Sequence, residues 1–294
     1  MELRVLRYFL AVAREQSISG AAEYLHLSQP TLSRQLREME EELGKQLFTR
    51  GSRKIALTEE GVILRKRAEE IVNLVQKAEN EITQAGETII GDVYIGTGET
   101  DAVRILARAA KQMQKQYPGI RFHISSGDLF DVTEKLDKGL LDFGILFSDI
   151  DSTKYDYMEM PIKDTWGVLM RRTDALAGKE YITPEDLLNK PLIMSRQQTA
   201  NTALVKWFQT DYEKLNIAAT YNLIYNASLL VDEGLGYAIG LDKLINVSGD
   251  CNLSFKPLYP TLKAKIHVVW KKYPVFSKAA EKYLAKLREI MLNK

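Results

Sequence analysis

The chain has 294 residues, 45% of them hydrophobic, so it can form two or three domains that each bury a core. Its 40 basic and 39 acidic residues give a net charge of +1, which by itself indicates no nucleic-acid partner. The single cysteine, Cys251, excludes an internal disulfide framework and multi-thiolate metal sites, and we expect it to be a small buried residue in a reducing compartment.

The first stretch predicts an amphipathic helix and no signal peptide. Charged residues interrupt its apolar ones, and no apolar run in the chain reaches the length of a membrane span. We therefore expect a cytoplasmic protein without a membrane partner. The apolar residues of this helix recur at helical spacing and should pack on the two helices that follow: Leu6, Phe9, Leu10 and Ala13.

Two short helices are expected to meet at a sharp turn between Ile18 and Arg37. The first covers Gly20–His26. The second begins after Ser28, a favourable N-cap, and has Pro30 in its first turn, where a missing N–H costs little. One face of the second helix is predicted to be buried because its apolar residues are spaced by four, three and four: Leu32, Leu36, Met39 and Leu43.

The opposite face of the second helix carries polar and basic side chains. They offer hydrogen-bond donors and phosphate partners near the start of a helix, as a helix lying in the major groove of DNA would require. The predicted DNA-contacting residues on this helix are Ser28, Gln29, Pro30, Thr31, Ser33, Arg34 and Arg37.

A basic hairpin is predicted after Gly44, which favours the end of a helix. Arg50, Arg53 and Lys54 surround its Gly-Ser turn, and the first 67 residues hold 12 basic against 9 acidic side chains. These charges could belong to a solvated loop. Beside a helix-turn-helix, we expect them to contact DNA phosphates instead.

The helices and the hairpin together form a dense pattern over roughly the first sixty residues. Its members are Ala21, Ala22, Leu25, Leu27, Ser28, Gln29, Pro30, Ser33, Gln35, Glu40, Leu43, Gly44, Leu47, Phe48, Arg50, Arg53, Leu57, Thr58 and Gly61. This pattern resembles the winged helix-turn-helix of LysR-type transcriptional regulators. The resemblance implies base or backbone contacts by the second helix and wing contacts by Arg50 and Arg53. Thr31, Met39 and Glu60 depart from the family pattern, which bears on the bases that are read.

A long helix is expected after the hairpin, because Thr58 is a favourable N-cap and Glu59 and Glu60 suit the positive end of the helix dipole. It should run to about Gln84. Its apolar residues repeat as a heptad seam: Leu64, Ala68, Ile71, Val75, Ala78 and Ile82. The seam could pack on the C-terminal part of the same chain. We expect a dimer instead, because a twofold operator needs two copies and the resemblance implies a linker helix that pairs between subunits.

From Ile89 the pattern changes to alternating strands and helices, which predicts an α/β region. A first unit has strands at 93–95, 120–124 and 142–147 and helices at 102–117 and 132–138. A second has strands at 166–170, 192–194 and 221–225, helices after Thr183 and at 202–215, and a helix-strand step over 229–240. A strand within 262–272 and a helix over 276–291 follow. Similarity to the family's regulatory half implies that this last strand returns to the first unit.

The predicted fold is an α+β multidomain chain with three parts. They are a winged helix-turn-helix over residues 1–58, a linker and dimerisation helix over 59–87, and a two-lobed α/β, periplasmic-binding-protein-like regulatory domain over 88–294. Lobe I is expected to comprise 88–161 and 266–294, and lobe II 162–265, with crossovers near 161 and 265.

Two such lobes place ligands in the cleft at the carboxyl ends of their strands. A helix N-terminus after Thr100 would favour an anion there, but Glu99 would repel one unless Arg196 or a cation offsets its charge. Each hydroxyl alone could serve a local turn or cap, whereas the set together points to a ligand. The candidate effector-binding residues are Thr97, Gly98, Glu99, Thr100, Ser125, Ser126, Phe147, Ser195, Arg196, Gln197 and Asn226.

Signatures of an enzyme are not found in the sequence. His26, His123 and His267 lack metal-ligand spacing, and there is no Walker loop or nucleophile elbow. We therefore expect no catalytic residues, no metal and no cofactor.

The sequence predicts a sequence-specific transcription regulator of LysR type. We expect its partners to be double-stranded DNA with an interrupted palindrome, a small-molecule effector, and further copies of the chain in a homodimer or tetramer, with RNA polymerase as a further partner to consider. Two alternatives are a DNA-binding protein whose second half only oligomerises, and an enzyme or transport-binding protein with an accessory N-terminal domain. The second alternative would require catalytic residues or a signal peptide, and we find neither in the sequence.

Overall fold

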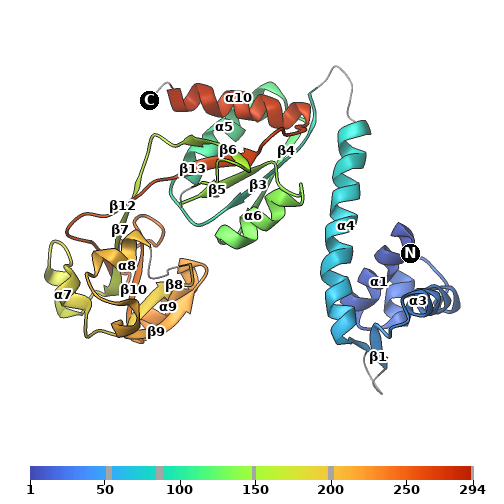
Figure 1. Cartoon of the computed structure of the whole chain (residues 1–294), viewed down its shortest axis with the longest axis horizontal. Coiled ribbons are helices and arrows are strands. Elements are labelled where there is room, and N and C mark those ends of the chain that lie inside the picture. Colours follow the sequence, from blue (N-terminus) through green and yellow to red (C-terminus); the bar gives the residue numbers. More distant parts are fainter. Residues whose placement is uncertain (51–54, 84–88, 148–149, 198–201, 293–294) are drawn as a thin grey trace. The chain divides into compact units, whose positions relative to one another are not determined.

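The computed structural model describes residues 1–50, 55–83, 89–147, 150–197 and 202–292. The chain divides into two compact units, Met1–Ala85 and Gly86–Lys294 (Figure 1). Among the described residues, no helix has both the length and the apolar character needed to cross a membrane.

The first unit is a small helical domain with a β-hairpin. Its elements are α1 (Leu3–Glu15), α2 (Ile18–Tyr24), α3 (Gln29–Leu43), β1 (Phe48–Arg50), β2 (Ile55–Leu57) and α4 (Glu59–Thr83). Phe9, Leu32 and Leu47 lie at the centre of its core. The predicted face of α1 is confirmed for Leu6 and Phe9, which are buried, but Val5 and Val12 are buried as well and Ala13 is only partly so.

Side-chain caps set the ends of the first helices. The Ser17 hydroxyl accepts a hydrogen bond from the Gly20 N–H (3.2 Å), so α2 begins two residues before the predicted start. The helix also ends earlier than predicted, and His26 has a φ of +54° in the turn. The Ser28 cap of α3 is confirmed by its hydrogen bond from the Thr31 N–H (3.4 Å), and Gly44 ends that helix at a φ of +63°.

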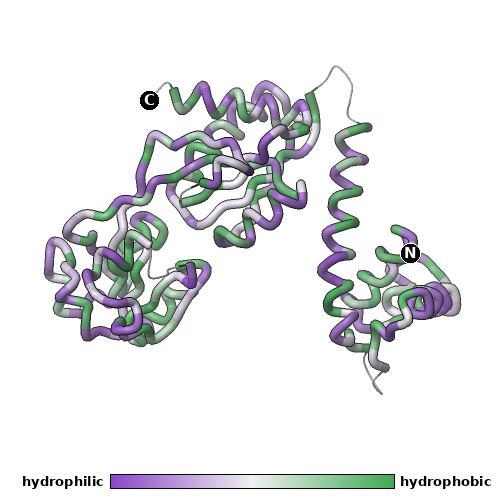
Figure 2. The backbone as a smooth tube through the Cα atoms, viewed as in Figure 1, coloured by the Kyte–Doolittle hydropathy of each residue, from purple (hydrophilic) through white to green (hydrophobic). Residues whose placement is uncertain are grey.

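The predicted buried face of α3 is confirmed for Leu32, Leu36 and Met39 but not for Leu43, which is 41% exposed. Figure 2 shows hydrophilic residues along α3. Helical spacing identifies residues on one side of a helix, but Leu43 lies at its last turn, where the neighbouring helices no longer cover that side.

The long helix α4 begins at the predicted cap, since the Gly61 N–H donates to the Thr58 hydroxyl (3.0 Å). The residues of its predicted heptad seam lie in two environments. Leu64 and Ala68 pack into the core of the first unit, whereas Ile71 is 40% and Ile82 76% exposed within the chain. The first two seam residues are therefore part of a domain core and are not available to pair with another helix.

Lobe I of the second unit is a five-stranded sheet between helices. Its strands lie in the order β4 (Ile120–Ser126), β3 (Gly91–Thr97), β5 (Phe143–Leu146), β13 (His267–Lys271) and β6 (Tyr155–Glu159). The first three strands are parallel, and β13 and β6 are antiparallel to their neighbours. Helices α5 (Val103–Gln116) and α10 (Lys278–Leu292) pack on one face and α6 (Leu129–Asp137) on the other (Figure 1).

Lobe II of the second unit is a six-stranded sheet. Strands β11 (Leu253–Pro257), β7 (Asp164–Arg171), β10 (Tyr237–Leu241), β8 (Leu192–Ser195) and β9 (Ile217–Tyr221) follow one another, and β12 (Lys263–Ala264) pairs with β7. Helices α7 (Pro184–Leu187) and α8 (Ala203–Trp207) pack on one face and α9 (Ile224–Asp232) on the other. Short 3-10 turns lie at Ala175–Gly178 and Tyr212–Lys214.

The chain crosses between the lobes twice over a few residues. The first crossing joins β6 to β7 and the second joins β12 to β13, and the Met160 N–H donates to the Ile266 carbonyl (2.8 Å) between them. The last strand therefore lies in the sheet of lobe I, although it is separated from β5 by more than a hundred residues of sequence.

Several predicted elements of the second unit were wrong. The helix expected over 202–215 ends at Trp207, and the strand expected at 221–225 is β9, which ends at Tyr221. Residues 224 and 225 belong instead to α9. Strands β6 and β11 were not predicted, because they lie at sheet edges, where only part of each strand is buried and apolar alternation is weak. Cys251 was expected to be buried but is partly exposed.

Candidate nucleic-acid interface and ligand site

The outer face of α3 presents the predicted DNA-contacting side chains to solvent. Ser28, Gln29, Pro30, Thr31, Arg34 and Arg37 are exposed, and Ser33 is half-buried. The Arg34 side chain is 70% exposed and lies 3.8 Å from Glu38 on the same helix. A surface pair of this kind contributes about 0–1 kcal/mol, so it can be exchanged for a phosphate or a base edge at little cost.

The β-hairpin is fixed to α3 by a partly buried carboxylate contact. Glu40 Oε1 accepts hydrogen bonds from the backbone N–H groups of Leu47 (2.7 Å) and Phe48 (3.3 Å). The Thr58 hydroxyl donates to the Gln46 carbonyl (2.8 Å) on the other side of the hairpin. These bonds set the position of the hairpin relative to the exposed face of α3. Arg50 ends β1, and the predicted contacts Arg53 and Lys54 lie outside the described residues.

Four predicted ligand-site residues join lobe I to lobe II, and we call the region around these contacts the lobe junction. The Glu99 carboxylate accepts a hydrogen bond from the Ile224 N–H at the start of α9. The Thr100 hydroxyl donates to Asp164 Oδ2 (2.5 Å). Lobe I thus supplies a carboxylate to a helix N-terminus of lobe II. The N-terminus of α9 therefore offsets the negative charge of Glu99.

Arg196 does not offset Glu99, because its partners are other carboxylates. Its Nε donates to Asp128 Oδ2 (2.5 Å), and its Nη2 lies 3.2 Å from Asp131. Asp128 is also the N-cap of α6, accepting from the Asp131 N–H (3.0 Å). The adjacent Gln197 side chain accepts from the Leu129 N–H (3.1 Å). Two consecutive residues of lobe II therefore bind the start of α6 in lobe I.

The remaining candidates make local contacts or lie elsewhere. The Thr97 hydroxyl donates to the Gly98 carbonyl (2.6 Å), and Phe147 packs so close to Gly98 that a Cβ there would lie 2.6 Å from its ring. The Ser195 hydroxyl accepts from the Gln197 N–H (3.4 Å). Ser125 and Ser126 end β4, at the sheet edge. Asn226 was expected after a strand, but it lies on the exposed side of α9.

Comparison with known proteins shows what the two units are. Residues 3–62 match the model of the bacterial regulatory helix-turn-helix protein, lysR family, and residues 87–291 match the LysR substrate binding domain. The chain belongs to the LysR family of transcriptional regulators. The family consists of regulators and not of enzymes, so the predicted absence of enzymatic activity is confirmed by this membership.

Individual relatives of this LysR-family chain agree with that assignment. The HTH-type transcriptional regulator BsdA of Bacillus subtilis (strain 168) is 34% identical over 74% of this chain and 74% of its own length. The DNA-binding transcriptional dual regulator OxyR of Escherichia coli (strain K12) is 31% identical, over 66% of this chain and 63% of OxyR. The full-length CbnR structure with its target DNA has a TM-score of 0.75, at 19% identity over 99% of this chain and 100% of CbnR, and shows a common fold.

The carboxylates at the lobe junction of this LysR-family chain fall into two electrostatic classes. Burial raises the pKa of Glu99 and of Asp164 above the ordinary values. Burial also acts to raise the pKa of Asp128, but the hydrogen bonds from the Asp131 N–H and from Arg196 outweigh it and lower that pKa. The folded chain therefore favours the charged form of Asp128, whereas burial disfavours the charged forms of Glu99 and Asp164.

Sequence reasoning missed Asp128, Asp131 and Asp164 as members of the junction. For the first two a local signal existed, because an aspartate followed three residues later by another before an apolar run is a capping-box pattern, and the structure shows that box. Asp164 had no such signal. Its role depends on Thr100, which is 64 residues away in sequence.

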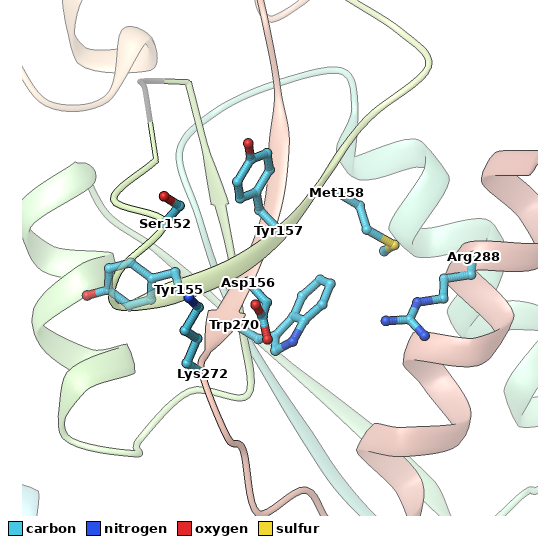
Figure 3. A pocket seen from close by; sticks show the side chains of 8 residues that line it. All are labelled: Ser152, Tyr155, Asp156, Tyr157, Met158, Trp270, Lys272 and Arg288. Carbon is cyan, nitrogen blue, oxygen red and sulfur yellow. The ribbon is translucent and has the colours of Figure 1, made fainter.

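A surface depression of about 440 Å³ lies on lobe I, away from the junction (Figure 3). In Figure 3 the Arg288 side chain extends from α10 toward Trp270, and Tyr157 and Met158 lie on β6. None of the predicted effector-binding residues lines this depression. Within the described part of the chain, no group of three or more His, Cys, Asp or Glu side chains could hold a metal ion.

Proposed function

We propose that this LysR-family chain binds an interrupted palindrome sequence-specifically and that a small molecule bound between lobes I and II controls its effect on transcription. The observation that carries the proposal is the lobe junction. Among the described residues, side-chain hydrogen bonds of Glu99, Thr100, Arg196 and Gln197 connect the two lobes. A ligand that exchanges these bonds for its own would change the angle between the lobes.

Pairing of two copies through α4 is part of the proposal. The apolar side chains of Ile71, Leu74 and Ile82 are exposed within the chain, and an apolar stripe on a long helix favours burial against a second helix. Two paired copies would present two α3 helices to the two half-sites of an operator. Rearrangement of the lobes would then change the spacing of these helices on DNA and the contacts with RNA polymerase.

DNase footprinting of the full-length protein on its operator tests this mechanism. We expect a metabolite from a library that stabilises the protein thermally to shift or shorten the footprint and to change DNA bending and transcript level. A footprint, bend and transcript level that stay unchanged at saturating ligand would contradict control by an effector.

The second candidate function is a DNA-binding protein whose C-terminal half only oligomerises. It is favoured by the closed lobe junction, where the protein's own groups satisfy one another. Under this candidate no metabolite raises Tm, whereas dilution lowers it because the assembly dissociates.

A further inference from the structure

Lobe II contains a cavity of about 260 Å³ on the side of its sheet that faces α9. Most of its lining is apolar, with Leu169 of β7, Phe255 of β11, Ile224 of α9, and Val247 and Ile245 from the segment after β10. Small-molecule sites are usually about 300–1,000 Å³ in volume. This cavity lies just below that range, so we expect it to hold no more than one ring with a short chain.

The edge of this cavity reaches the lobe junction. Ile224, which lines the cavity, is the residue whose backbone N–H donates to the Glu99 carboxylate of lobe I. Asp242 also lines the cavity and accepts from the Thr165 N–H (2.9 Å), one residue after the Asp164 that binds Thr100. Of these carboxylates only Asp242 lines the cavity, whereas Glu99 binds the Ile224 N–H at its edge and Asp164 adjoins Thr165. A ligand in the cavity would therefore place its polar end beside Asp242, with Glu99 and Asp164 nearby.

The charges at this edge are predominantly negative. Lys243 lines the cavity, but its ammonium lies 3.5 Å from Asp242. Arg196 is bound to Asp128 and Asp131. Burial and the charge of Asp242 raise the pKa of Asp164, against the opposing effects of the Thr100 hydrogen bond and the Lys243 charge. The carboxylates here outnumber the cations that could neutralise them.

We propose that this cavity binds an apolar amine, with its hydrocarbon or aromatic part among the apolar side chains and its ammonium group at the acidic edge. The inference rests on the proposed function, because it names the ligand class of the same regulatory half. An anionic ligand would use the N-terminal N–H groups of α9, and Glu99 already occupies the first of them. Glu99 is thus a specificity-determining residue that selects against carboxylates.

Three probes with the same ring and similar length test the charge preference: 2-phenylethylamine, 3-phenylpropanoate and 2-phenylethanol. Each is titrated into the full-length protein and followed by calorimetry. We expect the amine to bind with a Kd at least about tenfold lower than that of the carboxylate. Glu99→Gln should reduce this ratio to about threefold or less, because the amide still accepts the Ile224 N–H but carries no charge.

A cavity-filling substitution tests the location. Val247→Phe should abolish binding of the amine by occupying the cavity, while leaving operator binding unchanged. Val275→Phe is the matched control, since Val275 is 93% exposed on lobe I and does not line the cavity. We expect this control to bind the amine like the unmodified protein.

Equal or tighter binding of 3-phenylpropanoate, survival of amine binding in Val247→Phe, or absence of saturable binding by all three probes would each overturn the inference. These results leave effector control itself standing if a library metabolite still alters the footprint. Conversely, amine binding that is lost in Val247→Phe supports the cavity assignment even where the footprint does not respond, and that outcome counts only against the proposed regulatory function.

Discussion

The two units of the chain hold their candidate functional side chains in opposite states. On α3 of the first unit, Arg34 and its polar neighbours face solvent, with Leu32 and Leu36 buried behind them. At the lobe junction of the second unit, Glu99 and Arg196 are already bound to partners from the other lobe. The first surface is open to a partner, whereas a ligand at the lobe junction would have to displace internal hydrogen bonds.

Arg34→Ala provides the strongest test of the first half of this comparison. Loss of a direct base contact costs about 1–3 kcal/mol, so we expect specific operator affinity to fall by about 5- to 150-fold for each recognition helix. Fluorescence anisotropy on the operator measures the loss, and Tm and ligand affinity should stay nearly unchanged. Arg4→Ala removes the same charge from an exposed position on α1 and serves as the control. Undiminished operator binding by Arg34→Ala would show that α3 docks differently.

The first unit could be predicted closely because its determinants are local. Ser28, Gly44 and Thr58 define helix ends through contacts with residues at most four positions away. The errors arose where a neighbouring element decides the outcome. Leu43 has the spacing of a buried residue but lies beyond the cover of the other helices, and Ala68 has the spacing of a dimer seam but packs into its own domain.

The second unit was predictable in its α/β alternation and less so in its site. The sequence singles out the residues after the strands as a set, but four of them bind partners from distant sequence, as in the contact of Arg196 with Asp128. Spacing cannot reveal such a pair, because it forms only when two separately folded lobes meet. The same limit applies to β6 and β11, which are held at sheet edges by hydrogen bonds to neighbouring strands and less by their own apolar pattern.

Glu40→Ala tests whether DNA binding by the exposed face of α3 depends on the attachment of the hairpin to that helix. The substitution leaves the Leu47 and Phe48 N–H groups without their acceptor, which should cost about 1–3 kcal/mol of unfolding free energy. We expect a lower urea midpoint for the first unit together with weaker operator binding. Glu40→Gln keeps one acceptor oxygen and should lose less in both measurements. Equal behaviour of the two variants would indicate that the carboxylate contact does not position the hairpin.

Asp128→Asn tests the bound state of the lobe junction through its pH dependence. The pKa of this carboxyl is lowered in the folded chain, so its contribution is present above the unfolded pKa of about 3.9 and is lost as the pH falls through the lower folded value. Asparagine keeps the cap of α6 but loses the charge that pairs with the half-exposed Arg196, at a cost of about 1 kcal/mol near neutral pH. Thermal melts from pH 7 to pH 3 should show the two proteins converging, and a constant difference would contradict the assignment.

Asp164→Asn should show the opposite pH dependence at the same junction. Burial raises the pKa of Asp164, so the carboxyl favours the folded state below its unfolded pKa of about 3.9 and loses that contribution as the pH rises through the higher folded value. Asparagine can still accept the hydrogen bond from Thr100. We therefore expect the variant to match or exceed the unmodified Tm by about 1–2 °C at pH 7 and to lose this advantage near pH 4. The same pH dependence of Tm in Asp164→Asn and Asp128→Asn would mean that the two aspartates share one electrostatic environment. The assignment of a lowered pKa to Asp128 and a raised pKa to Asp164 would then be wrong.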